Sequence, residues 1–225
     1  PSTKCLSTFD ICPYFDGFLL RVPKKTDHTQ LEEITQQRKT YEIYKEHVNW
    51  CNLIGINNIS DLNSLPKEHR STLIKVSEAL HEKKIAKIAE QIAENKNIRI
   101  VLIAGPSSSG KTTTSKRLSV QLAASGIKPR TLSLDNYYLT HDKTPLDEFG
   151  ELDFESLYAL DLPLLNQQLG QLIAGETVTP PIFNFKTEQR EWGKPMQLKE
   201  NEILVIEGIH GLNPLLLPKE LDKNL

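Results

Sequence analysis

Residues 105–112 read GPSSSGKT, which is a glycine, four residues and then Gly-Lys-Thr. This spacing follows a phosphate-binding loop pattern in which backbone N–H groups surround phosphate oxygens. An apolar run, residues 98–104, precedes the loop, and residues 111–125 follow it without a helix breaker. Because the first turn of a helix also attracts anions, the sequence predicts a strand–loop–helix unit that binds a nucleoside triphosphate.

Two side chains of this loop are expected to contact the phosphates and Mg²⁺. Lys111 would supply a positive charge for the terminal phosphates, and the Thr112 hydroxyl can bind Mg²⁺. A serine-rich turn that merely begins a helix is the structural alternative. The residues predicted to contact ATP are Gly105, Pro106, Ser107, Ser108, Ser109, Gly110, Lys111, Thr112 and Thr113.

Two carboxylates follow apolar runs that read as buried strands. Asp135 closes residues 130–135, and Glu207 lies near the end of residues 202–208. Because ligands of open parallel sheets bind beyond the carboxyl ends of the strands, both acids should face the phosphates. One acid would help to hold Mg²⁺, for which we favour Glu207, and a second could accept a proton from an attacking hydroxyl. Either could instead stabilise a turn.

The order of the elements predicts an α/β chain in two parts. Residues 1–95 read as a smaller α+β module, with a strand at 18–22 and helices over 31–51 and from Ser71 or Thr72. Residues 96–225 alternate strands and helices, which predicts a parallel sheet with helices on both faces. Within this part, residues 154–174 read as helical with a break near Pro163.

Composition narrows the choice of partner and compartment. The formal net charge is −2, which gives nucleic acid no general electrostatic attraction to the chain. No apolar run approaches the roughly 20 residues that a bilayer requires. Three cysteines without a C-x-x-C pair do not form a disulfide framework. These features are typical of a protein of the reducing cytoplasm that does not bind nucleic acid, and a homo-oligomer remains possible.

The stretches SLDNYY, DFES, PPIFNF and LVIEGIHGLNP, together with the loop, resemble the uridine kinase and phosphoribulokinase family of phosphate-loop kinases. They occur in the family's order over most of residues 98–214. Residues 14–23 and 74–92 are similar to the segment that precedes the kinase in bacterial nucleoside kinases carrying a threonyl-tRNA-synthetase-like module.

The resemblance implies Mg²⁺- and ATP-dependent phosphorylation of a nucleoside 5′-hydroxyl, with uridine as the first candidate. By position, Asp135 would be the general base and Asp153 would bind the ribose hydroxyls. Asp153 could also be the N-cap of a helix that begins at Phe154, and the two roles are compatible. A switch protein that binds RNA or another protein under the control of nucleotide is the competing hypothesis.

The same resemblance predicts an aromatic pocket for the base. Phe183 and Phe185 correspond to aromatic positions of the family, and Arg190 corresponds to an arginine that could contact substrate. Glu188 stands where uridine kinases carry a histidine that reads the base, which is a departure from the pattern. Tyr137 could line this pocket or pack in the core.

The resemblance ends near Pro214, and the family's adenine contacts and arginine-bearing lid would lie beyond it. We therefore expect the sequence to be part of a longer protein. Outside the kinase pattern, His47 and Cys51 are four residues apart on an expected helix, a spacing that permits metal ligation but is better explained by packing.

Overall fold

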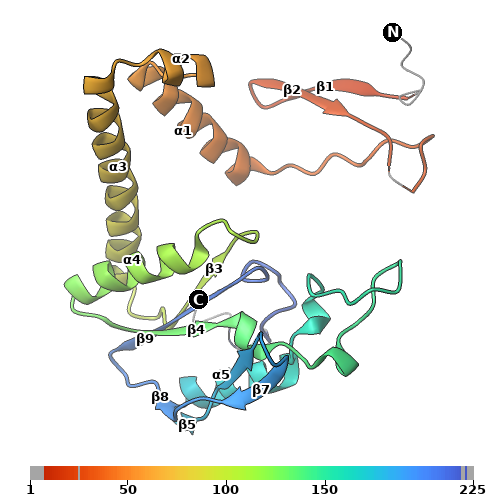
Figure 1. Cartoon of the computed structure of the whole chain (residues 1–225), viewed down its shortest axis with the longest axis vertical. Helices are drawn as coiled ribbons and strands as arrows, with labels where there is room; N and C mark the ends of the chain where they lie inside the picture. The colour runs from red at the N-terminus through yellow and green to blue at the C-terminus, as the bar shows by residue number, and fades with distance from the viewer. Residues whose placement is uncertain (1–7, 25, 219–220, 222–225) are drawn as a thin grey trace. The chain divides into compact units, whose positions relative to one another are not determined.

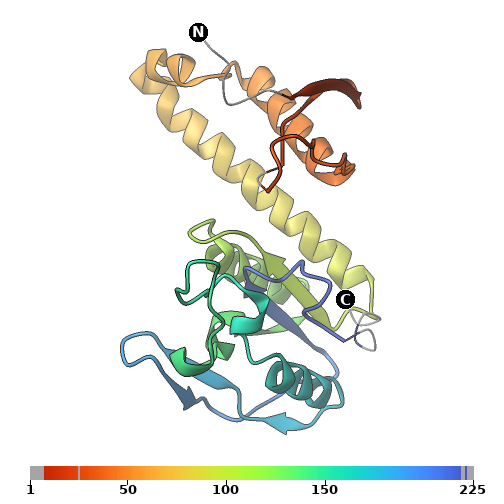
Figure 2. The same cartoon turned by 90° about the vertical axis from the view of Figure 1, so that its right-hand side faces the viewer.

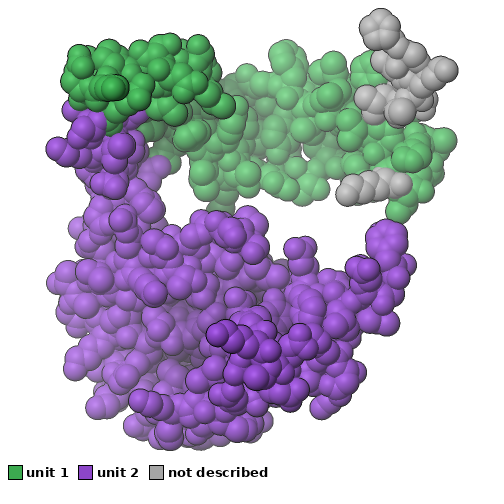
Figure 3. Space-filling model, viewed as in Figure 1, with its two compact units in different colours: residues 1–70 green, residues 71–225 purple. Residues whose placement is uncertain are grey.

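A computed structural model of the chain describes residues 8–24, 26–218 and 221. It divides into two compact units, Pro1–Arg70 and Ser71–Leu225, which Figure 3 shows in green and purple. In the described residues, no helix is both long enough and apolar enough to cross a membrane.

The first unit consists of a β-hairpin and two helices (Figure 1). Strands β1 (Asp10–Tyr14) and β2 (Gly17–Arg21) pair in antiparallel register. Helix α1 (Arg38–Ile54) begins seven residues after the start predicted at residue 31, so that prediction was wrong for its first two turns. Helix α2 (Ile59–Ser64) has a capping box, in which Asn58 and Asp61 each accept from the other's backbone N–H.

Helix α3 (Lys67–Glu94) is continuous across the division between the units, and Figure 2 shows it in yellow. It begins before the predicted caps Ser71 and Thr72, both of which lie inside the helix. Its last turns bury Ile85, Ala89 and Ile92 in the same cluster as residues of the sheet. This packing explains why the compact units divide at residue 70, whereas the sequence pattern places the boundary after residue 95.

The second unit is built on a three-stranded parallel sheet. Its strands are β3 (Ile100–Ala104), β9 (Glu202–Gly208) and β4 (Lys128–Ser133), in the spatial order β3-β9-β4. The central strand β9 is buried along its whole length. Such complete burial is expected of a parallel strand that is covered on both faces.

Alternate residues of β9 divide the core into two layers. Ile203 and Val205 join the cluster of α3 and α4 (Lys111–Ala124). Leu204 and Ile206 point to the opposite layer, which includes α5 (Leu162–Ile173). The predicted α/β fold, a parallel sheet between helices, is therefore confirmed.

The segments between β4 and β9 are mostly short. They comprise the 3₁₀ helices η1 (Leu134–Tyr137), η2 (His141–Lys143) and η3 (Leu157–Ala159), and the strand pairs β6 (Pro181–Asn184) with β7 (Gln189–Trp192) and β5 (Thr177–Val178) with β8 (Met196–Gln197). Of residues 154–174, which were predicted to be helical, only those of α5 form an α-helix. Pro163 lies in its first turn and Asp161 is its N-cap.

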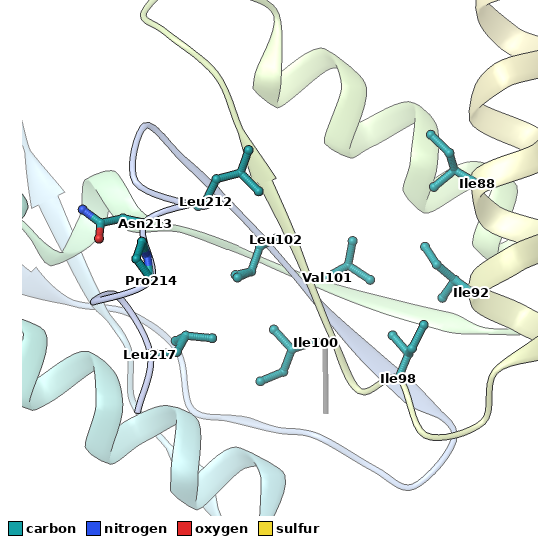
Figure 4. A pocket seen from close by; sticks show the side chains of 11 residues that line it. Ile88, Ile92, Ile98, Ile100, Val101, Leu102, Leu212, Asn213, Pro214 and Leu217 are labelled. Atoms are coloured by element: carbon teal, nitrogen blue, oxygen red, sulfur yellow. The ribbon is translucent and has the colours of Figure 1, made fainter. Parts of the chain in front are cut away.

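An apolar cavity of about 480 Å³ borders strand β3 (Figure 4). Ile88 and Ile92 of α3 line one side of it, and Ile100 and Leu102 come from the strand. Leu217 belongs to the segment after β9 that lines the other side. Strand β3 pairs only with β9 among the described residues, so this cavity lies at an edge of the sheet.

Candidate active site

The phosphate loop connects β3 to α4, and two of its residues have positive φ angles. Gly110, at the N-cap of α4, has φ of 87°, and Ser108 has φ of 58°. A Cβ atom at Gly105 would lie 2.6 Å from the Ser109 Oγ, so this position accepts only glycine without rearrangement. Residues 106–110 are exposed, which leaves the loop accessible to a ligand.

Lys111 and Asp135 line one cavity of about 450 Å³. Lys111 is the first residue of α4, and its Nζ donates to the carbonyl oxygen of Pro106, 2.9 Å away. Asp135 lies on η1, two residues after β4 ends, rather than on the strand itself as predicted. The structure thus brings the loop lysine and the predicted base together through two different strand–loop connections.

The electrostatics of this cavity act against ionisation of Asp135. Burial raises the pKa of its carboxyl group, and the nearby Glu207 carboxylate raises it further, while Lys111 lowers it. A carboxyl group with a raised pKa holds a proton more readily than a solvated one. This property suits a group that receives a proton from an alcohol.

The two predicted metal ligands, Thr112 and Glu207, line a second cavity of about 340 Å³. Glu207 is only 8% exposed, and its Oε1 accepts a hydrogen bond of 2.9 Å from the Ser133 hydroxyl. In the sheet register, Glu207 lies between Ile103 and Ser133 on the neighbouring strands. The central strand therefore carries this carboxylate to the same end of the sheet as the loop.

Elsewhere, the His47 Nε2 and the Cys51 Sγ lie 3.6 Å apart on α1. Among the described residues, no group of three or more His, Cys, Asp or Glu side chains could hold a metal ion.

Asp153 stabilises a turn in the loop before η3. Its Oδ1 accepts from the backbone N–H groups of Glu155 and Ser156, at 3.0 and 3.1 Å. The expected helix from Phe154 is absent from this described segment, so the prediction that Asp153 caps a helix was wrong, and Asp153 instead stabilises a turn. Asp153 does not line the cavity of Asp135, whereas the adjacent Phe154 and Glu155 do.

Tyr137 and Tyr138 occupy different environments although they are neighbours. Tyr137 is fully buried, and its hydroxyl donates to Gln168 Oε1 at 2.8 Å. Burial raises the pKa of Tyr137 far above its ordinary value. It still borders the second cavity, whereas Tyr138 lines the cavity of Asp135 and is 9% exposed.

The two predicted base-pocket phenylalanines lie against Tyr138. Phe183 is buried on β6, and Phe185, just after that strand, is 64% exposed. Their ring centroids are 5.0 Å apart, and each is 6.0 to 6.4 Å from the Tyr138 ring. Phe183 therefore packs in the core, whereas Phe185, two residues further along the chain, is exposed.

Arg190, predicted to contact substrate, binds protein groups in this structure. Its guanidinium donates to Asp161 Oδ2 at 2.8 Å and to the backbone oxygen of Tyr138 at 3.2 Å. These contacts join β7 to the cap of α5 and to the segment after η1. Arg190 thereby fixes the position of the loop that carries Tyr138.

The sequence reasoning assigned no function to several residues of the Asp135 cavity. Phe154, Glu155 and His210 line it, and the His210 Nε2 is buried without a hydrogen-bond partner among the described residues. The available signal was position: these residues lie within three residues of Asp153 and Glu207. These residues could have been predicted to line the site because they are close in sequence to the predicted acids.

Comparison with known proteins identifies the family of this part of the chain. Residues 100–215 match the Phosphoribulokinase / Uridine kinase family, which is about half of the chain. The chain belongs to this family. The matched residues begin with β3 and include the phosphate loop, η1 and β9, so membership covers every element that borders the two cavities.

Individual relatives within the family cover similar parts of the chain. A uridine kinase from Ligilactobacillus salivarius is 32% identical over 120 residues, which are 53% of this chain and 54% of that protein. A uridine kinase from Brevibacillus brevis is 28% identical over 126 residues, covering 56% of this chain and 55% of that protein. The chain spans about half the length of these curated relatives.

One solved structure, described as a possible uridine kinase from Bacillus stearothermophilus, aligns with a TM-score of 0.48 and 28% identity. The alignment covers 56% of this chain and 70% of that one.

Proposed function

We propose that the protein transfers the terminal phosphate of ATP to the 5′-hydroxyl of a nucleoside. The observation that carries this proposal is the shared cavity of Lys111 and Asp135, which also contains the aromatic side chains of Tyr138 and Phe154. A lysine can hold the phosphates, a carboxylate can orient the hydroxyl, and aromatic side chains can stack on a nucleobase. The uridine kinases among the relatives make uridine the first acceptor to test.

The residues present fit ATP and Mg²⁺. The exposed loop, with its close approach of Gly105 to Ser109, leaves backbone N–H groups free of bulky side chains. Thr112 and Glu207 supply the hydroxyl and carboxylate oxygens that Mg²⁺ prefers. When bound, Mg²⁺ neutralises charge on the phosphates. Lys111 would place a further positive charge beside them.

In the proposed reaction, Asp135 orients the nucleoside hydroxyl and receives its proton. The hydroxyl oxygen forms a bond to the terminal phosphorus as the bond from that phosphorus to the bridging oxygen breaks, which releases ADP. Because phosphoryl transfer passes through a loose transition state, positioning contributes more than strong basicity. The partial burial of Asp135 supports this positioning role.

The finer assignments of the substrate pocket are proposals as well. Asp153 would bind the ribose hydroxyls with its second carboxylate oxygen, since the first is engaged by the turn. Phe185 would offer an exposed face for stacking on the base, with Phe183 behind it. Tyr137 and Arg190 would act indirectly, by holding η1 and the Tyr138 loop in place.

Two further proposals come from the sequence rather than from the site. Residues 1–95 would form a module similar to the second additional domain of threonyl-tRNA synthetase. The location would be the cytoplasm, because three cysteines without a C-x-x-C pair are not the pattern of a secreted disulfide framework.

The test is ADP formation by the full-length protein with ATP, Mg²⁺ and a panel of ribonucleosides. We expect nucleoside-dependent ADP release and a 5′-monophosphate product, both lost in Asp135→Asn. ATP binding should survive in that variant, which separates loss of transfer from loss of nucleotide. ADP release that is independent of every nucleoside, together with tight RNA binding, would instead favour a nucleotide-controlled switch.

A further inference from the structure

Four aromatic rings and one imidazole form a cluster beside the proposed acceptor cavity. Tyr138 packs edge-to-face with Phe154 at 6.1 Å, with Phe183 at 6.0 Å and with Phe185 at 6.4 Å. Tyr138 and Phe183 are buried, whereas Phe154 is 37% and Phe185 is 64% exposed. The cluster therefore consists of two buried rings and two exposed ones, and a flat ligand can stack on the exposed rings.

His141 lies at the margin of this cluster. Its ring centroid is 5.3 Å from that of Phe154, with the planes inclined by 60°. Its Nδ1 is 3.1 Å from Oε2 of Glu188, which belongs to the turn between β6 and β7. Two segments 47 residues apart thus place a polar pair next to the exposed aromatic rings.

The turn that carries Glu188 is firmly built. Glu188 has φ of 57°, an uncommon conformation for a residue with a side chain, and its N–H donates to the Asn184 oxygen at 2.7 Å. Phe183 on the same hairpin donates its N–H to the Asn136 side chain at 3.3 Å. Asn136 is adjacent to Asp135, so the hairpin is attached to the helix that carries the proposed base.

Folding stability alone does not explain why His141 and Glu188 are paired. The side chains of His141 and Glu188 are 37% and 56% exposed, and a polar pair with such exposure contributes little to folding, whether or not the imidazole is charged. The pair lies instead where a ligand would meet it, next to Phe154, which also lines the cavity of Lys111 and Asp135.

We propose that His141, oriented by Glu188, contacts the edge of the nucleobase and sets the choice of acceptor. This inference rests on the proposed nucleoside kinase activity. A carboxylate accepts the hydrogen of Nδ1, which leaves Nε2 of the neutral imidazole as a hydrogen-bond acceptor. The complementary edge is one with an N–H donor, and uracil presents such a group at N3. Glu188, where the family pattern has histidine, therefore acts through a histidine on another loop.

The experiment compares uridine with 3-methyluridine, whose N3 has no hydrogen, as acceptors for the full-length protein. We expect the wild type to prefer uridine by about tenfold or more in kcat/KM, the effect of one hydrogen bond in a protected site. In His141→Leu the preference should disappear through a higher KM for uridine, with kcat little changed. Glu188→Gln should have a smaller effect in the same direction, because the amide holds the imidazole less firmly.

Lys143→Leu, a change at an exposed residue of the same 3₁₀ helix, is the matched control and should keep the wild-type preference. Circular dichroism and thermal melting should show that all variants are folded. If the wild type phosphorylates neither nucleoside nor any other in the panel, the kinase proposal fails and this one with it. If the kinase is active but the ratio between the two acceptors is the same in the wild type and His141→Leu, the role of His141 is refuted and the kinase stands.

Discussion

Gly208→Ala tests whether the packing between β9 and η1 determines where Asp135 lies. A Cβ atom at Gly208 would lie 2.6 Å from the Leu134 Cβ and 2.7 Å from its Cδ1. Leu134 is 2% exposed and directly precedes Asp135, so it has no open space into which to turn. Restoring ordinary carbon–carbon contact requires a shift of about 1 Å in η1 or β9.

This shift should have two measurable consequences. Overpacking a core site typically costs about 1–3 kcal/mol, so we expect a lower free energy of unfolding by that amount. For a chain of this size each kcal/mol lowers the melting temperature by about 2–4 °C. A displacement of about 1 Å at a reacting group can reduce the rate about 100-fold. The rate of nucleoside phosphorylation should therefore fall by about this factor even though the variant remains folded.

Gly170→Ala is the matched control for this variant. Gly170 lies inside α5, and an added Cβ would meet no atom within 4 Å. This replacement should stabilise the helix by up to about 1 kcal/mol and leave activity unchanged. Urea denaturation followed by circular dichroism measures both variants. Equal stability of Gly208→Ala and the wild type, with full activity, would refute the packing argument.

Three further variants test the charges of the second unit. Asp135→Asn should lower kcat by about 10²- to 10⁴-fold in the coupled ADP assay. Because the folded pKa of Asp135 is raised, the stability that this carboxyl contributes is present below its ordinary pKa of 3.8 and is lost as the pH rises through the folded value. Melting curves should therefore show Asp135→Asn to be more stable than the wild type at pH 7, with the difference vanishing near pH 3; a lower stability at pH 7 would contradict this. Glu202→Gln should lower stability by about 1–2 kcal/mol at pH 7, because the buried carboxylate accepts from Arg130 and the Lys199 N–H. The hydrogen bond from Arg130 lowers the pKa of Glu202, so this loss should shrink as the pH falls below 4.5, and a loss independent of pH would refute the role of its charge. Arg190→Ala should raise the KM for nucleoside about tenfold by releasing the Tyr138 loop, while the KM for ATP stays constant in steady-state kinetics; equal changes in both constants would argue against this local effect.

Strands β3 and β9 could be predicted from local sequence because each is a run of mostly apolar residues. Strands β3 and β9 and helix α4 lie within a residue or two of their predicted ranges, since burial on both faces leaves little choice of residue. The loop of Lys111 needs only glycines and a following helix, so its pattern is also local.

Other features depend on contacts that no local pattern reveals. Helix α1 begins late because residues 32–37 continue an extended segment that pairs near the hairpin, where the Glu32 N–H donates to the Val22 oxygen. The predicted helix near Phe154 is replaced by a turn, in which the Asp153 Oδ1 accepts from the N–H groups of Glu155 and Ser156. The position of Glu188 beside His141 likewise depends on how two distant loops fold together.

The most direct test of the central proposal is a crystal structure of the protein with a non-hydrolysable ATP analogue, Mg²⁺ and uridine. The 5′-oxygen should lie within hydrogen-bond distance of the Asp135 carboxylate, about 2.6–3.2 Å, and in line with the terminal phosphorus held by residues 105–112. A nucleoside whose sugar lies away from Asp135, or a triphosphate bound outside the loop, would contradict the account.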